Sequence, residues 1–151
     1  MLKGLRVSIL LLAVMGNLGW SFSAKASFNG KLTVEIDGLK NKEGEVCASL
    51  FASSEGFPSD RDRVLQKQCT KITDNPFEIT FNNLKAGSYA VAVFHDQNND
   101  RTLNRNILGI PSEGFGFSSN PEIRTSAPKF SEAAFLVAGP DTNIHIQLKY
   151  F

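Results

Sequence analysis

Short segments in which apolar and polar residues alternate follow one another along the chain from about residue 30 onward. A period of two is typical of β-strands with one buried and one solvent-facing side. We therefore expect strands in residues 32–36, 46–51, 64–72, 77–81, 88–94, 130–137 and 142–150. No segment of this region shows a sustained helical period of 3.6 residues. The pattern predicts an all-β domain, a single antiparallel β-sandwich of about seven strands with an immunoglobulin-like arrangement.

Three segments say more about the arrangement of these strands. Residues 88–94 are apolar on both faces, which indicates a central strand covered on both sides. The polar segment 38–44 begins and ends with glycine, so we expect a turn there and a hairpin between the strands on either side. Residues 95–128 are rich in Asn, Gly, Ser and Pro, and so long an irregular stretch inside one domain is commonly functional or disordered.

The N-terminal segment 1–26 has the parts of a secretory signal peptide. Lys3 and Arg6 give it a positive start, and the apolar stretch that follows is too short to cross a bilayer of about 30 Å. Ala24-Lys25-Ala26 supplies the small residues that signal peptidases recognise. We therefore expect export, cleavage, a mature domain over residues 27–151 that does not span the membrane, and a periplasmic or extracellular location. The alternative is an uncleaved N-terminal anchor.

Both cysteines of the chain, Cys47 and Cys69, lie in the part predicted to be exported. In an oxidising compartment such a pair normally forms a disulfide, and two free buried thiols are the alternative. The bond would close a loop of about 23 residues, for which chain entropy gives a stabilisation of roughly 3 kcal/mol.

A cluster of Asp and Asn follows the central strand and resembles part of a calcium-binding loop. Asp96, Asn98 and Asp100 occupy positions 1, 3 and 5 of such a loop, and Asn104 occupies position 9. The pattern departs from an EF-hand because Arg101 stands where the loop has glycine and no glutamate closes it. Two interpretations stay open: a weak Ca²⁺ site, and Asx turns in which these side chains bond their own backbone.

The next segment, 109–118, combines glycines with Phe115 and Phe117. One interpretation is a rigid loop that presents both rings to a ligand, with His95 and Glu113 as polar neighbours. The other is that the rings fold back and close one end of the sandwich. An enzyme would need His95, Asp96 and Glu113 to converge in one cleft, and the sequence shows no set of nucleophile, base and oxyanion donors.

Three motifs in this region together resemble a bacterial family, domain of unknown function 2141. They are Gly87-x-Tyr89-Ala90-Val91-Ala92-Val93, His95-Asp96-x-Asn98-x-Asp100 and Gly109-Ile110-Pro111-Ser112-Glu113-Gly114-Phe115-Gly116-Phe117-Ser118. The resemblance covers about residues 30 to 150 and implies an exported β-sandwich without a settled activity. Members commonly carry an acidic residue where this chain has Asn104. Leu84-x-x-Gly87-x-Tyr89 is also similar to prealbumin-like and carboxypeptidase-regulatory sandwich modules, a looser analogy.

The charge balance bears on the class of partner. Lys plus Arg number 16 and Asp plus Glu number 15, a net charge of +1 that gives no electrostatic reason to expect nucleic acid. The sequence favours a non-enzymatic binding or accessory module of the periplasm or cell surface, with a small-molecule ligand or an envelope protein as partner and Ca²⁺ as the one cofactor suggested. A structural or assembly protein of the cell envelope is the alternative, and an enzyme is a third.

Overall fold

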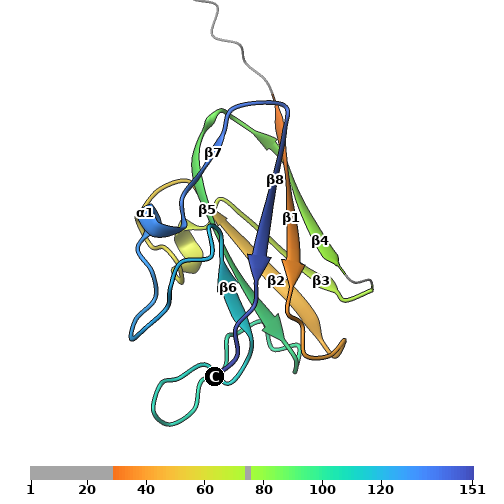
Figure 1. The fold of residues 1–151 in the computed structure, drawn as a ribbon, viewed down its shortest axis with the longest axis vertical. Coiled ribbons are helices and arrows are strands. Elements are labelled where there is room, and N and C mark those ends of the chain that lie inside the picture. Colours follow the sequence, from red (N-terminus) through yellow and green to blue (C-terminus); the bar gives the residue numbers. More distant parts are fainter. Residues whose placement is uncertain (1–28, 74–75) are drawn as a thin grey trace, which may run out of the picture.

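The structure, a computed structural model, describes residues 29–73 and 76–151 (Figure 1). The predicted signal peptide lies outside the described residues. The strands are β1 (Gly30–Asp37), β2 (Glu45–Phe51), β3 (Gln66–Lys71), β4 (Phe77–Leu84), β5 (Gly87–Asp96), β6 (Phe115–Phe117), β7 (Phe135–Val137) and β8 (Asp141–Gln147). A 3₁₀ turn, η1, covers Arg61–Arg63, and the short helix α1 covers Phe130–Ala133. None of the helices in the described part has the length and apolarity needed to cross a bilayer.

The strands form two sheets that pack face to face, which confirms the predicted β-sandwich. One sheet has three strands in the order β4-β1-β8, and the other has five, with the path β3-β2-β5-β6 and β7 paired to β5. All pairs between the described strands are antiparallel except β1 with β8. These two strands start at the same end of the sandwich and run side by side in the same direction (Figure 1), so their pairing is parallel.

The predicted hairpin across residues 38–44 is wrong. The strand before this segment, β1, lies in the three-stranded sheet, and β2 lies in the five-stranded sheet. Both hydrogen-bonding edges of β1 are already used, one by β4 and the other by β8. No edge is left for β2, so the turn carries the chain from one sheet to the other.

Two segments differ from the predicted strands. Where a strand was expected over 130–137, the chain forms α1 and then β7. The helix begins because the Glu132 carboxylate accepts a hydrogen bond from the backbone N–H of Lys129, a capping-box contact that turns the chain. In contrast, β6 lies inside the stretch expected to be irregular and pairs with β5.

Apolar side chains fill both sides of the five-stranded sheet. Between the sheets lies a core that includes Leu32, Ile36, Leu50, Phe81 and Val91. A second cluster on the opposite, outer face contains Ala90, Phe115, Phe117 and Ala133, with Phe57, Ala92, Phe94, Leu103, Ile123 and Phe130 against it. Alternate residues of β5 thus face two apolar layers, which confirms the prediction of a strand covered on both sides. The outer layer is contributed by connecting segments, and it positions the candidate site.

The predicted disulfide is present between Cys47 and Cys69. The two residues are direct partners in the antiparallel pair of β2 and β3. Their neighbours Val46 and Ala48 face the intersheet core, so the disulfide lies on the outer face of the sheet. It fixes β3, an edge strand, to the centre of the sheet.

Candidate functional site

A cavity of about 660 Å³ lies on the outer face of the five-stranded sheet. Its floor consists of side chains from β2, β3, β5 and β6, namely Ser49, Phe51, Lys67, Ala92, Phe94, Phe115 and Phe117. Its walls come from the connecting segments 52–65, 97–114 and 118–129 and from Phe151. Loops held by a rigid sheet commonly carry ligand-binding residues, which makes this cavity the candidate functional site.

The apolar part of the lining is built from packed rings. Phe115 and Phe117 have centroids 6.0 Å apart with planes inclined by 69°, and Phe57 lies 6.0 Å from Phe117. Both β6 rings are buried, but against the outer face of the five-stranded sheet and not at one end of the sandwich as the second interpretation expected. They also line the cavity. On the wall, Leu108 and Ile110 keep much of their apolar surface exposed. The cavity therefore offers a ligand both fixed rings and accessible aliphatic side chains.

Among the Lys, Arg, Asp and Glu side chains of the described residues, those that line the cavity are all basic. They are Arg61, Lys67, Arg101, Arg105 and Arg124. Burial lowers the pKa of the Lys67 ammonium, and the neighbouring charges of Arg61 and Arg101 lower it further. Asp96 and Glu45 act in the opposite direction, each more weakly than either arginine. One end of the cavity is therefore a region of positive potential.

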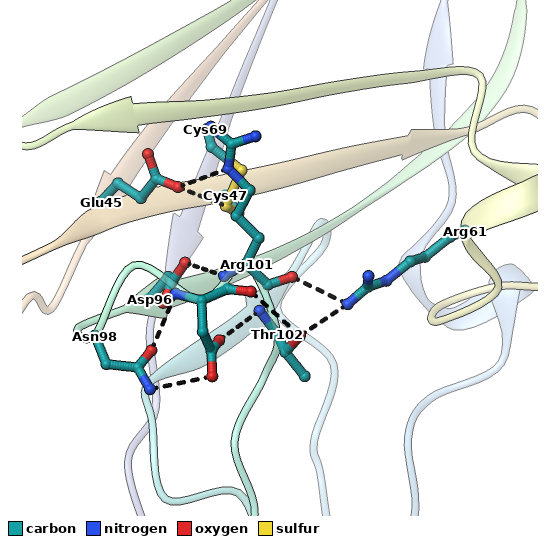
Figure 2. The surroundings of a disulfide bond; sticks show 9 residues. Glu45, Cys47, Arg61, Cys69, Asp96, Asn98, Arg101 and Thr102 are labelled. Atoms are coloured by element: carbon teal, nitrogen blue, oxygen red, sulfur yellow. Dashed lines mark hydrogen bonds and ion pairs between the residues drawn. A yellow bond between two sulfur atoms is a disulfide. The ribbon is translucent and has the colours of Figure 1, made fainter.

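All four arginines of this group make polar contacts, and Figure 2 shows those of Arg61 and Arg101. Arg61 Nη2 donates hydrogen bonds to the carbonyl oxygen of Arg101 at 3.1 Å and to Thr102 Oγ1 at 2.9 Å. Arg101 extends toward the disulfide, and its Nε lies 3.5 Å from a carboxylate oxygen of the largely buried Glu45. Lys67 has no ion-pair partner in the described part of the chain. Arg105 Nη1 donates to the carbonyl oxygen of Gly109 at 2.8 Å, and Arg124 Nη2 pairs with Glu122 at 2.8 Å. In the described part of the chain, Lys67 is thus the cation of the lining whose charged group makes neither a hydrogen bond nor an ion pair.

The predicted calcium loop forms Asx turns. Asp96 is fully buried, and its two oxygens accept hydrogen bonds from the backbone N–H groups of Asp100 at 3.1 Å and Arg101 at 2.7 Å. Asp100 in turn accepts from the N–H of Thr102 at 2.8 Å and from the Asn98 amide at 3.1 Å. Arg101 has φ +60°, the left-handed conformation for which an EF-hand uses glycine at this position. The loop geometry is therefore held by its own side chains.

Asn104 is the loop residue whose bonding is incomplete. Its amide nitrogen donates to Asp100 Oδ2 at 2.9 Å, and this bond is the main reason that the pKa of the Asp100 carboxyl is lowered. Its amide oxygen is buried and has no hydrogen-bond partner. An unpaired oxygen beside a carboxylate suits a hard cation such as Ca²⁺, while the bonded oxygens of Asp96 and Asp100 would have to exchange partners. Calcium binding here stays a prediction.

Groups of three His, Cys, Asp or Glu ligand atoms within 4.8 Å occur elsewhere in the described residues. One joins Glu45 to the two cysteines. Because those sulfurs are in a disulfide, they supply no thiolate to a metal and no hydrogen to the nearby carboxylate. The other joins Glu35, Asp37 and His145 on the solvent side of the three-stranded sheet, where His145 Nε2 lies 3.3 Å from Asp37 Oδ2.

The two polar residues expected beside the ligand, Glu113 and His95, do not line the cavity. The buried Glu113 carboxylate accepts from the N–H groups of Gln97 at 3.0 Å and Asn104 at 2.9 Å, which closes the base of the 97–114 segment. His95 is fully buried between the hydroxyl of Tyr150 and the carbonyl oxygen of Glu43. Both residues thus have structural partners, and Phe115 and Phe117 are the members of the predicted ligand set that reach the cavity.

The sequence did not predict that Arg61, Lys67 and Arg101 meet at one end of the cavity. These residues come from three separate elements, namely η1, β3 and the segment after β5. One signal was available. The period of two in the third predicted strand places Lys67 on the same face as Cys69. If the disulfide had been assigned to the outer face of the sheet, the same alternation would have placed the Lys67 side chain on that face too.

Comparison with known proteins gives one match. No curated protein and no solved structure matches the chain. Residues 34–145 match the family described as "uncharacterized protein conserved in bacteria (DUF2141)". The matched range runs from β1 into β8 and includes the Asx turns, the basic residues and the rings of the cavity. Because it covers most of the chain, this protein belongs to the DUF2141 family of uncharacterized bacterial proteins, as its motifs predicted.

Proposed function

We propose that this protein is a non-enzymatic binding module that holds a small, partly apolar molecule in the cavity on the outer face of its five-stranded sheet. The observation that carries the proposal is the cavity itself. Its volume of about 660 Å³ falls in the range of small-molecule sites, roughly 300–1,000 Å³. Aromatic rings form much of its floor, and a few charged groups stand at one end, the usual composition of such sites.

The construction of the floor supports binding of a ligand in a fixed orientation. The rings of Phe115 and Phe117 belong to a strand paired with β5. Phe117 packs against Phe57 and Phe115 packs against Phe117, which limits the motion of both rings. A preformed site of this kind loses little side-chain entropy when a ligand enters. The Leu108 and Ile110 side chains on the wall supply apolar area that a ligand would cover.

The bonding of the polar residues supports a role other than catalysis. An enzyme using His95, Asp96 and Glu113 would need at least one of them to offer a proton-transfer group to a substrate. Both ring nitrogens of His95 are bonded within the fold, and both oxygens of Asp96 and of Glu113 accept backbone hydrogen bonds. These contacts hold backbone segments and Tyr150, near the C-terminus, in place, which is a structural role.

The proposed location is the periplasm or the outside of the cell, where this protein would act as an accessory or carrier module. The signal-peptide pattern of residues 1–26 motivates this location. The disulfide is consistent with it, because such bonds persist in oxidising compartments.

The proposal is tested with a neutral apolar fluorophore, N-phenyl-1-naphthylamine, whose emission rises when it leaves water. Wild-type protein is expected to bind it saturably at one site. Ala92→Trp places an indole ring on the floor, where it occupies part of the cavity and should strongly weaken binding. Leu136→Trp is the matched control, because Leu136 is exposed on β7 away from the cavity. The fold of each variant is checked by thermal unfolding.

Two results would overturn the proposal. One is the absence of saturable binding by folded wild-type protein. The other is equal binding by wild type and a folded Ala92→Trp variant, since the probe would then sit elsewhere. If Ala92→Trp does not fold, Ser49→Trp places the same ring on the neighbouring strand of the floor and serves the same purpose.

A further inference from the structure

We propose that the ligand of this cavity is an amphipathic organic anion, with its carboxylate or sulfonate held by Arg61, Lys67 and Arg101 and its apolar body on the rings of the floor. This inference rests on the proposed function, because it names the chemical class that the same cavity accepts. It is carried by the placement of charge in the cavity.

The balance of charge favours an anion. The Lys, Arg, Asp and Glu side chains that line the cavity are five cations and no acid within the described residues. The nearest carboxylates are committed elsewhere: Glu45 pairs with Arg101, and Asp96 accepts two backbone hydrogen bonds. Arg124 is also offset, by Glu122 at 2.8 Å. Among the described residues, Arg61, Lys67 and Arg105 have no carboxylate partner. A bound anion would complete the charge balance that the protein leaves open.

The arrangement of the cations gives the anion a defined place. Lys67 lies on β3, and its ammonium interacts electrostatically with Arg61 of η1 and with Arg101 of the 97–114 segment. The two arginines are also joined, since Arg61 donates to the Arg101 carbonyl oxygen and to Thr102 Oγ1 (Figure 2). Three elements far apart in the sequence therefore bring like charges together. Such a cluster is unfavourable when empty and favours a ligand that neutralises it.

The apolar surface specifies the rest of the ligand. The same cavity is lined by the rings of Phe94 and Phe115 and by the aliphatic side chains of Leu108 and Ile110. An inorganic anion would neutralise the charges and leave this surface in water. A neutral hydrocarbon would cover the surface and leave the cations unpaired. A molecule with one acidic group on an apolar body uses both parts, and charge-assisted hydrogen bonds to the acid would fix its orientation.

The test uses two fluorophores that differ by one acidic group, N-phenyl-1-naphthylamine and 1-anilinonaphthalene-8-sulfonate. Wild-type protein is expected to bind the sulfonate roughly tenfold more tightly than the neutral probe at low salt. The preference should shrink as salt is raised, because the screening length falls from about 10 Å at 0.1 M to about 3 Å at 1 M. Dodecanoate should displace the sulfonate, and dodecanol should do so less well.

Substitutions locate the charge effect. Lys67→Gln should weaken sulfonate binding roughly tenfold and leave the neutral probe unchanged. Lys71→Gln is the matched control: the same strand and residue type, outside the cavity lining, with no expected effect on either probe. Lys67 is preferred to Arg61 for this test because it makes no contact that holds a loop, so its removal changes charge and not geometry.

The outcomes separate this inference from the proposed function. If both probes bind equally and Lys67→Gln changes neither, the cavity binds apolar molecules and the inference is wrong. If Lys71→Gln weakens the sulfonate as much as Lys67→Gln does, the effect is one of overall charge and the inference also fails. If folded wild-type protein binds neither probe, the proposed function itself fails. Selective loss of sulfonate binding in Lys67→Gln supports the inference.

Discussion

The hydroxyl of Tyr150 donates a hydrogen bond to Nδ1 of His95 across 2.8 Å and so ties the C-terminal segment to β5. The direction of this bond follows from the other ring nitrogen. His95 Nε2 lies 2.7 Å from the carbonyl oxygen of Glu43, which can only accept, so Nε2 carries the hydrogen and Nδ1 of the neutral ring is an acceptor. His95 is fully buried, and these two bonds satisfy its ring.

Removing the hydroxyl should therefore destabilise the fold. Tyr150→Phe leaves a buried acceptor without a donor, and we expect the free energy of unfolding to fall by about 1–3 kcal/mol in chemical denaturation. Tyr89→Phe is the control. The Tyr89 hydroxyl donates to the carbonyl oxygen of the exposed residue Lys85, where water can take its place, so its loss should cost about 1 kcal/mol or less. Equal losses in the two variants would contradict this account of His95.

The same tyrosine predicts a loss of stability at alkaline pH. Burial raises the pKa of Tyr150 above its ordinary value near 10, while a hydrogen bond from the Lys40 N–H acts in the opposite direction. A group whose pKa is raised on folding contributes stability that is complete below about pH 10 and is lost as pH rises through the folded-state pKa. The free-energy difference between wild type and Tyr150→Phe should therefore shrink above pH 10. A difference that stays constant into the alkaline range would contradict the prediction.

Close packing at the ring of Tyr150 predicts the effect of a substitution at Gly114. A Cβ atom at this position would lie 2.2 Å from Cζ of Tyr150, far inside contact distance. Gly114→Ala must displace the ring and its bond to His95, and we expect a loss of roughly 1–3 kcal/mol. Gly139→Ala is the control, because nothing lies within 4 Å of its Cβ. It should change the free energy of unfolding by less than about 1 kcal/mol. Similar effects of the two substitutions would show that the ring does not constrain Gly114.

Calcium binding by the 96–104 loop is predicted to be weak. The side chains would have to leave their present partners, so we expect a dissociation constant on the order of 10⁻⁴ to 10⁻³ M. At about 1 mM calcium the gain in stability would be roughly 0.4–1.4 kcal/mol, seen as a small rise in melting temperature. Asp100→Asn should remove this rise, and Glu55→Gln, a charge change in another loop, should not. No difference between several millimolar calcium and chelator would leave the Asx turns as the full explanation of this motif.

Much of the fold could be predicted from local pattern. Alternation assigns each strand residue to one of two faces, because successive side chains point in opposite directions. That rule identified most strands, the strand covered on both sides and the sandwich. It failed at 130–137, where the Glu132–Lys129 capping contact produces a helical turn, and at 115–117, where three residues are too few to show a period.

The pairing of strands was decided by the tertiary structure. Backbone hydrogen bonds are the same for every sequence, so alternation does not say which strand lies beside which. The parallel pair of β1 and β8 and the separation of β1 from β2 depend on which edges remain free after the other strands have docked. Closing a longer loop costs little more than closing a short one, and sequence neighbours therefore have no decisive advantage.

The candidate site also has one part that the sequence predicted and one part that depends on the tertiary structure. The sequence by itself determined the Asx-rich loop and the aromatic segment, because each is a run of neighbouring residues. It also placed Cys47 and Cys69 in the one domain that is predicted to be exported. Only the tertiary structure decided that Arg61, Lys67 and Arg101 share one end of a cavity. Their proximity results from the packing of η1 and the 97–114 segment over the outer face of the sheet. The electrostatic potential depends on the distances between charges in space, so a cluster formed by distant parts of the chain is not visible in the sequence.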